Sequence, residues 1–159
     1  MDIGAGSGRD AAAPARLGHR VVAVEPTAEL RSRGQRIHAG QDVEWVDDAL
    51  PELRVLRARA RRYDLILTTA VWMHLDLQQR AAMEQVAGLL AAEGQVVLSL
   101  RHGPVPAGRR MFDVPVRETV ALAAGHGLGA VHVSEREDPH GRQGVRWSCL
   151  GLRRGTAVS

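Results

Sequence analysis

A glycine-rich turn at the start of the chain is the first stretch whose residue types could do chemistry. Gly4, Gly6 and Gly8 occupy alternate positions in "MDIGAGSGRDAA". Glycine adopts positive φ at no steric cost and lets the backbone approach a ligand closely. Because "DIG" has the character of a strand end, we expect the turn to lie at the carboxyl end of a buried strand. Ligands of open α/β sheets bind at such positions.

An acidic residue at the end of the next apolar run complements this turn. The stretch "HRVVAVEP" predicts a strand buried on both faces, and its acid, Glu25, lies seventeen residues after Gly8. A carboxylate there can accept hydrogen bonds from the two vicinal hydroxyls of a ribose. The pair indicates an adenosine-containing ligand. A structural turn followed by an ordinary surface glutamate is the alternative.

The spacing of the turn distinguishes between kinds of adenosine ligand. A nicotinamide-binding loop has the pattern G-x-G-x-x-G/A, with a small third residue that packs the helix on the strand. Here Arg9 occupies that third position, and the observed pattern is D-x-G-x-G-x-G from Asp2. This disfavours a nucleotide- or NAD-binding oxidoreductase fragment, which remains an alternative.

Helical and strand-like segments alternate along the chain and must position these residues. We predict strands at residues 2–4, 19–26, 43–46, 63–71, 95–101, 130–137 and 145–153. We predict helices at 8–18, 27–37, 50–62, 76–94 and 116–127, with Thr27 as an N-cap and Gly94 closing the fourth. The last two strands have no room for a helix between them and must be antiparallel. The prediction is one doubly wound α/β domain over 1–159, mostly parallel, with an antiparallel C-terminal edge hairpin.

Five segments in order resemble the Rossmann-like, seven-stranded S-adenosylmethionine-dependent methyltransferases. They are the glycine turn from Asp2, "VVAVEP", "VEWVDDALPEL", "YDLILTTAVWMHL" and "LLAAEGQVVLSL". The resemblance covers essentially the whole chain and implies a methyltransferase that takes its methyl group from S-adenosylmethionine. The acceptor it implies is a small molecule, methylated on an O, N or C atom that the sequence does not identify.

The resemblance also implies roles for individual residues. Gly4, Gly6 and Gly8 would let the backbone approach the methionine part of the cofactor, and Asp2 would orient its ammonium group. Glu25 would hold the ribose hydroxyls. Asp47 or Asp48 would accept a hydrogen bond from the adenine amino group, with Asp48 favoured; a solvated turn is the alternative. Thr69 and Ala70 would line the methyl side.

A sulfonium is already an activated methyl donor, so transfer mainly requires positioning and exclusion of water. A base helps only where the acceptor must lose a proton. His74, just beyond the fourth predicted strand, is the best candidate for such a base, and His102 is the second. The alternative is that His74 is a packing residue beside Trp72 and Met73.

The region "RHGPVPAGRRMF" lies where such enzymes vary their acceptor pocket. Arg101, Arg109 and Arg110 could bind an anionic substrate, or they could be exposed loop charges. In the final hairpin we expect Asp138 and Arg142 to pair across the turn. Met73, Met111 and the three tryptophans are expected in the core or the pocket wall.

Composition restricts the remaining classes. The 159 residues are 45% hydrophobic and 25% charged, as in a globular domain. All 21 basic residues are arginine and the net charge is only +3, so we expect no nucleic-acid partner. No stretch suits a membrane span or signal peptide, and Cys149 is the only cysteine, so we expect a cytoplasmic protein. No metal site is expected, and no oligomeric state is indicated.

The first predicted strand contains only its last residues. In the family the first strand is complete, and a helix or two before it supplies part of the acceptor lid. We therefore expect a domain that lacks this native helix and half of the first strand, which makes a non-catalytic S-adenosylmethionine-binding domain a further alternative.

Overall fold

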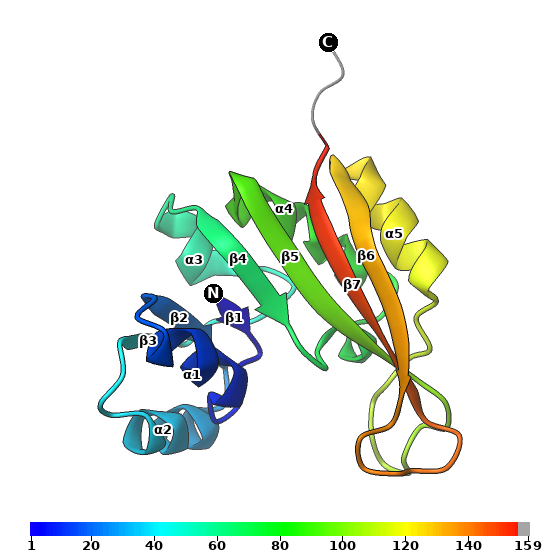
Figure 1. Ribbon diagram of the computed structural model, residues 1–159, viewed down its shortest axis with the longest axis horizontal. Helices are drawn as coiled ribbons and strands as arrows, with labels where there is room; N and C mark the ends of the chain where they lie inside the picture. The colour runs from blue at the N-terminus through cyan, green and yellow to red at the C-terminus, as the bar shows by residue number, and fades with distance from the viewer. Residues whose placement is uncertain (156–159) are drawn as a thin grey trace.

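A seven-stranded sheet in the order β3-β2-β1-β4-β5-β7-β6 forms the centre of the computed structural model, which describes residues 1–155 (Figure 1). Its strands are β1 (Asp2–Ile3), β2 (Val21–Val24), β3 (Val43–Val46), β4 (Tyr63–Thr68), β5 (Leu90–His102), β6 (Leu128–Glu137) and β7 (Arg146–Arg154). Neighbouring strands from β3 to β5 pair in parallel, whereas β7 is antiparallel to β5 and β6. The predicted sheet is confirmed; residues 156–159 of the predicted domain lie outside the described part.

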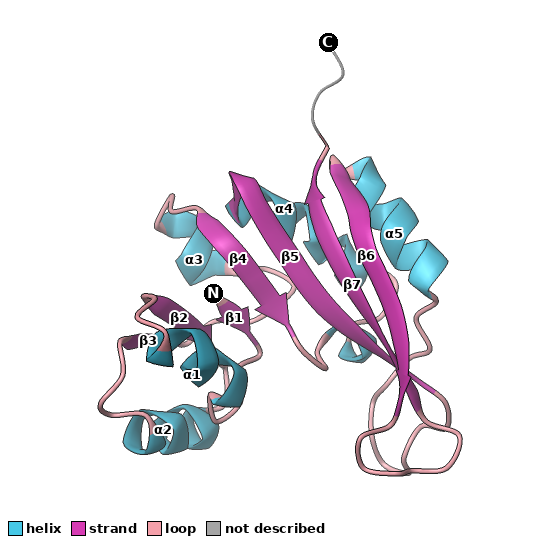
Figure 2. Cartoon of the chain, in the orientation of Figure 1, coloured by secondary structure: helices cyan, strands magenta, loops and turns pink. Residues whose placement is uncertain are grey.

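Helices cover the two faces of the sheet unequally (Figure 2). They are α1 (Arg9–Arg16), α2 (Ala28–Ile37), α3 (Arg54–Ala58), α4 (Met83–Leu89) and α5 (Val116–Gly125), with 3-10 turns η1 (Trp72–His74) and η2 (Gln79–Ala82). Helices α3, α4 and α5 pack behind the sheet, while the face of β5, β7 and β6 turned toward the viewer carries no helix within the described residues. That open face leaves room for a binding cavity.

Strand β2 is buried on both faces, as its continuous apolar run predicts. Val22 and Val24 belong to the main core, which includes residues of α3, α4 and α5. Val21 and Ala23 pack with Ala11 of α1 in a second, smaller core. Alternate residues of a strand point to opposite faces, so an all-apolar strand fits between two layers.

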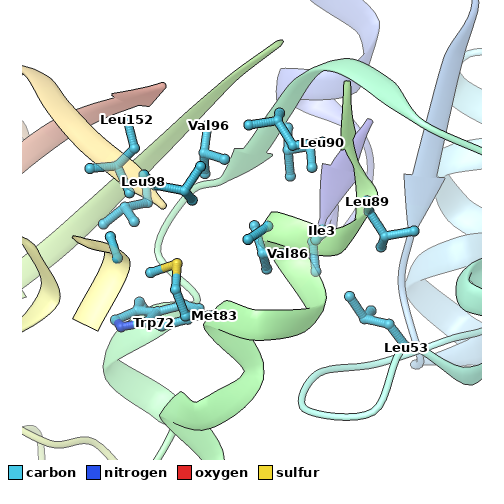
Figure 3. Packing of buried hydrophobic residues seen from close by; sticks show 14 of the residues in the cluster. Ile3, Leu53, Trp72, Met83, Val86, Leu89, Leu90, Val96, Leu98 and Leu152 are labelled. Carbon is cyan, nitrogen blue, oxygen red and sulfur yellow. The ribbon is translucent and has the colours of Figure 1, made fainter. Parts of the chain in front are cut away.

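The main core lies between the sheet and α4. Trp72, Met83 and Val86 approach Ile3 of β1 and Leu98 of β5 there (Figure 3). Trp72 is 1% exposed, so this tryptophan is a core residue, one of the two locations predicted. Complete burial of a large apolar side chain contributes about 1.5–3 kcal/mol.

The predicted helix over 76–94 is wrong in its last five residues, 90–94. Helix α4 ends at Leu89, and Leu90 already pairs with Tyr63 of β4 as the first residue of β5. A Cβ atom on Gly94 would lie 2.7 Å from Cδ1 of Leu90 and 2.9 Å from the Tyr63 carbonyl oxygen. Gly94 therefore permits close packing of the strand and does not close a helix. Tertiary burial of Leu90 overrides the helical propensity of this segment.

The predicted helix over 50–62 is also too long. Only α3 forms, because Leu53 adopts φ +45° and its side chain is fully buried immediately before the helix. The arginines that follow Leu56 are exposed. None of the helices within residues 1–155 has both the length and the apolar character that crossing a bilayer requires.

Strand β1 is the central strand and contains only two residues. Asp2 pairs with Ala23 of β2 and with Leu67 of β4. Both neighbouring strands begin before these paired residues, so their first residues have no partner in β1. A hollow of about 280 Å³ lies beneath Met1, lined by residues of β2 and β4. The two-residue length of β1 agrees with the short strand predicted at residues 2–4.

Candidate functional site

The carboxyl ends of β1 and β4 enclose a crevice where the order of strands reverses. The chain runs outward from β1 to β3 and then returns to β4 on the other side of β1. Open α/β sheets bind ligands at such a switch point. A cavity of about 290 Å³ opens there, lined by Asp2, Gly4, Ala5, Ser7, Arg9, Asp10, Thr69 and Ala70. The structure thus brings Asp2 and Gly4 together with the Thr69–Ala70 segment.

The three glycines of the turn are required for different reasons. Gly4 has φ +72°, and a Cβ atom on it would lie 2.4 Å from Cγ2 of Val71. A Cβ atom on Gly8 would lie 2.7 Å from the Trp45 ring. Gly6 has φ +57° and faces open space. Only Gly4 lines the cavity, whereas Gly6 lies toward β2.

Glu25 is fastened to the turn by its carboxylate. Its Oε2 accepts a 2.9 Å hydrogen bond from the Gly6 amide, and its Oε1 accepts a 2.9 Å bond from the Thr27 amide. The side chain is 6% exposed. Thr27 precedes α2 as the predicted N-cap residue, but its side chain makes no capping hydrogen bond. A carboxylate has about four acceptor positions, so each oxygen can accept a further bond.

Asp2 is buried at the floor of the cavity. It is 2% exposed, and its Oδ2 has no hydrogen-bond partner within the described residues. Burial, together with the neighbouring Asp10 carboxylate, raises the pKa of Asp2 from 3.8 to about 7. A buried acceptor without a partner at the edge of a cavity is suited to a cationic ligand group.

Asp47 and Asp48 follow β3 and have different partners. Asp47 is exposed and binds Arg31 of α2 at 2.9 Å. Asp48 accepts backbone amides at both oxygens, from Ala49 at 2.9 Å and from Leu56 of α3 at 3.0 Å. Asp48 therefore holds the loop and the first turn of α3 together, a role that the spacing of residues did not indicate.

The segment after β4 is held in a strained conformation by β5. Ala70 has φ +57°, a value that a non-glycine residue adopts only where its surroundings enforce it. Its amide donates a 2.9 Å hydrogen bond to Oγ of Ser99. Ser99 was not predicted as a site residue. Its signal is a single hydroxyl in the otherwise apolar run "QVVLSL".

A second cavity of about 870 Å³ adjoins the first and shares Arg9, Asp10, Thr69 and Ala70 with it. Its wall is formed by the open face of β5, β6 and β7 and by the loops beyond them. His74 lines it, and Nδ1 of His74 lies 3.0 Å from the carbonyl oxygen of Arg110. Because a carbonyl only accepts, that nitrogen carries the hydrogen, and in the neutral ring Nε2 has the free lone pair.

His102, the second candidate, contacts the wall residue Ser148 but does not line the cavity itself. Its Nε2 is 2.8 Å from Oγ of Ser148, and its Nδ1 is 3.5 Å from Asp113. It is not among the residues that line the large cavity. Of the two histidines, the structure brings only His74 to the predicted site.

The three arginines that the sequence grouped as candidate anion ligands have separate environments. Arg110 donates to Asp76 at 2.7 Å and stacks over Phe112 at 5.2 Å. Arg109 is exposed and lines the large cavity. Arg101 lines the same cavity but is only 6% exposed.

The β6–β7 hairpin closes the far side of the large cavity. Asp138 accepts from Arg142 at 2.7 and 2.9 Å and from Nε1 of Trp147 at 2.8 Å, which confirms the predicted Asp138–Arg142 pair. These hydrogen bonds hold the pKa of the Asp138 carboxyl well below its usual range, and those from Arg142 have the largest effect. Trp147 and Met111 form part of the wall, as predicted.

Comparisons with known proteins agree with this architecture. The chain is similar to 1,6-didemethyltoxoflavin-N1-methyltransferase from Burkholderia thailandensis, at 23% identity and a TM-score of 0.78 over 98% of this chain and 70% of that one. It is also similar to magnesium protoporphyrin IX methyltransferase from Synechocystis, at 15% identity and a TM-score of 0.77. That match covers 97% of this chain and 68% of the other. A third similar structure, a putative S-adenosylmethionine-dependent methyltransferase from Listeria monocytogenes, has 12% identity and a TM-score of 0.79. That match covers 98% of this chain and 90% of the other.

These structural likenesses concern the fold alone. No curated protein matches the sequence. A family described as "Methyltransferase domain" matches residues 1–148, which is nearly the whole chain. The protein therefore belongs to the methyltransferase domain family.

Proposed function

We propose that this protein transfers the methyl group of S-adenosylmethionine to a small-molecule acceptor bound in the 870 Å³ cavity. The observation that carries the proposal is that the two cavities adjoin and share Thr69 and Ala70 in their linings. The smaller cavity suits the methionine part of the cofactor, and the larger one has space for an acceptor. Solved relatives with this fold are named for acceptors as different as a porphyrin and a didemethyltoxoflavin, so the acceptor must be inferred from this chain's own residues.

The residues at the crevice fit S-adenosylmethionine. The unpartnered Oδ2 of Asp2 suits the ammonium group, and the free acceptor positions of Glu25 suit the ribose hydroxyls. The adenine amino group would bind Asp47 or Asp48 beyond β3. When bound, the cofactor supplies a methyl group on a sulfonium, which needs no further activation.

The chain's own contribution to transfer is positioning. The Ser99–Ala70 hydrogen bond fixes the backbone where the two cavities meet. The Asp138 hairpin and the loop around Arg109 wall off the acceptor side. Holding an acceptor in line with the methyl group lowers the entropic part of the barrier.

His74 is the proposed general base for an acceptor that must lose a proton. Its Nδ1 hydrogen is directed to the Arg110 carbonyl, which orients the ring and leaves Nε2 as the basic nitrogen. His74→Gln should lower kcat by about 10²- to 10⁴-fold while the affinity for S-adenosylhomocysteine stays unchanged. Unchanged kcat would make His74 a wall residue.

Methyl transfer can be measured without knowledge of the acceptor. The protein is incubated with S-adenosylmethionine labelled in its methyl group and a broad panel of small metabolites, and labelled products are identified by mass spectrometry. The proposal predicts a labelled product and an equal amount of S-adenosylhomocysteine. Tight binding of the cofactor with no transfer to any member would instead support the non-catalytic binding domain.

A further inference from the structure

Arg101 is a buried cation without a counter-ion. It is 6% exposed, its Nε is completely buried, and its guanidinium makes no hydrogen bond or ion pair with any residue in the range 1–155. Arg80 has similar burial, at 9% exposed, but donates to the Leu75 carbonyl at 3.1 Å and pairs with Glu118 at 3.6 Å. Arg101 thus departs from the way this protein otherwise buries an arginine.

Such an arrangement is costly unless a ligand completes it. A guanidinium remains charged at every physiological pH, so it cannot avoid the cost by losing a proton. Removing a charged group from water without giving it a partner is unfavourable, and Nε of Arg101 is fully enclosed without one. Arg101 lines the large cavity, so its polar atoms can be reached from there.

The position of Arg101 relates it to the methyl-transfer point. It lies two residues after Ser99 on β5, and residues two apart in a strand point to the same face, about 7 Å from each other. Ser99 in turn holds the Ala70 amide at 2.9 Å. Arg101 is also in register with Trp147 of β7, which forms part of the cavity wall.

The charge of the surrounding wall has the same sign. Arg109 and Arg136 also line the cavity and form no ion pair with residues 1–155. The one carboxylate in the lining, Asp10, binds Arg9 at 3.0 Å. A cavity with an excess of cations raises the local concentration of anions.

We propose that the methyl acceptor carries an anionic group, a carboxylate or a phosphate, and that Arg101 binds this group while the nucleophilic atom lies toward Ser99 and Ala70. This inference rests on the proposed function and assigns its substrate class. Arginine suits both anions because its planar fork donates two parallel hydrogen bonds.

The test uses protein saturated with S-adenosylhomocysteine and three probes: benzoate, phenyl phosphate and the uncharged benzamide. Binding is measured by NMR titration, with the side-chain indole of Trp147 as a local reporter. We expect at least one anion to bind about tenfold or more tightly than benzamide, because a charge-assisted hydrogen bond is worth that much. The stronger of the two anions identifies carboxylate or phosphate as the group.

Arg101→Met should lower the affinity for the preferred anion by about tenfold or more, while S-adenosylhomocysteine still binds. It should leave the melting temperature unchanged or raise it, because it replaces an unpaired buried charge by an apolar side chain. Arg101→Lys should keep the preference for the anion over benzamide with reduced affinity. Arg117→Gln, an exposed arginine on α5, is the matched control and should change neither quantity.

Equal binding of benzamide and both anions, or unchanged anion affinity in Arg101→Met, would overturn the inference. If Arg101→Met fails to fold, Arg101→Lys decides, and an unchanged affinity for the preferred anion in that variant would overturn the inference as well. Failure of S-adenosylhomocysteine itself to bind would count against the proposed function instead, so the two failures are distinguishable.

Discussion

The amide of Gly6 donates a 2.9 Å hydrogen bond to Oε2 of Glu25 and so joins the glycine turn after β1 to the end of β2. The second oxygen of Glu25 holds the Thr27 amide before α2. One carboxylate thus organises three segments at the edge of the sheet where the cofactor is proposed to bind. Its binding role and its structural role can be separated by experiment.

Glu25→Gln should weaken S-adenosylhomocysteine binding less than Glu25→Ala does. Loss of an acceptor for two hydroxyls should cost about 2–4 kcal/mol in the alanine variant, which is about 30- to 1,000-fold in Kd. Glutamine keeps one acceptor oxygen but faces one of the two amides with an NH₂ group. Calorimetric titration measures both variants, and the exposed Glu29→Gln on α2 is the matched control. Unchanged affinity in Glu25→Ala would remove Glu25 from the ribose site.

Asp2 should make cofactor binding depend on pH. Its pKa in the free protein is raised to about 7, mainly by burial, so the carboxyl is largely protonated at pH 6. The cofactor's ammonium group favours the ionised form, so binding should expel a proton. Affinity for S-adenosylhomocysteine should therefore rise about tenfold between pH 6 and pH 8. Calorimetry in buffers of different ionisation enthalpy detects the released proton.

Asp2→Asn is the control for this linkage. The variant should bind S-adenosylhomocysteine weakly, and its affinity should depend little on pH. The folded pKa lies above the unfolded value of 3.8, so the free protein binds this proton more tightly when folded. The stabilisation is complete below the unfolded pKa and is lost as pH rises through about 7. Wild type should thus lose about 3 kcal/mol more stability than Asp2→Asn between pH 5 and pH 8. Parallel stability profiles would contradict the raised pKa.

Asp47 and Asp48 should differ in stability as well as in binding. Asp48→Asn should lower the melting temperature because Asp48 holds two backbone amides, whereas Asp47→Asn should leave it nearly unchanged because an exposed ion pair contributes little. Comparing S-adenosylhomocysteine with S-inosylhomocysteine, which lacks the amino group, identifies the adenine acceptor. Only the variant of the residue that accepts from the adenine amino group should lose the preference for S-adenosylhomocysteine over S-inosylhomocysteine. If both variants keep the same preference, neither aspartate contacts adenine.

Gly34 of α2 should be intolerant of a methyl group. A Cβ atom there would lie 2.1 Å from Cη2 of Trp45, so Gly34→Ala should destabilise by about 1–3 kcal/mol. Trp45→Phe in the same chain should recover part of the loss. Gly88→Ala on α4 is the matched control, since open space surrounds that position, and it should stabilise by about 0.5–1 kcal/mol. Urea denaturation of the wild type and of these three variants measures their free energies of unfolding. An unchanged free energy of unfolding in Gly34→Ala would contradict the packing.

The strands were predictable because burial on both faces produces continuous apolar runs such as "VVAV" of β2. Helix lengths were less predictable. "LAAEG" favours a helix locally, yet it becomes the start of β5 because Leu90 is buried beside Tyr63, a contact distant in sequence. The left-handed Leu53 that delays α3 has the same kind of cause.

The candidate site was predictable where its residues follow strands directly, as Glu25 and Thr69 do. Ser99 and the paired roles of Asp48 depend on contacts between segments and have only weak local signals. The three candidate arginines look alike in sequence. Only the fold distinguishes the buried Arg101 from Arg110, which is already neutralised by Asp76.

The central claim is that S-adenosylmethionine binds across the carboxyl ends of β1, β2 and β4. An NMR titration of the ¹⁵N-labelled protein with S-adenosylhomocysteine tests it most directly, with NAD as the competing ligand. We predict saturable shift changes at the amides of Gly6, Thr27 and Ala70, each of which lies at this edge. Shift changes confined to other parts of the sheet, or changes at these amides with NAD and none with S-adenosylhomocysteine, would contradict the claim.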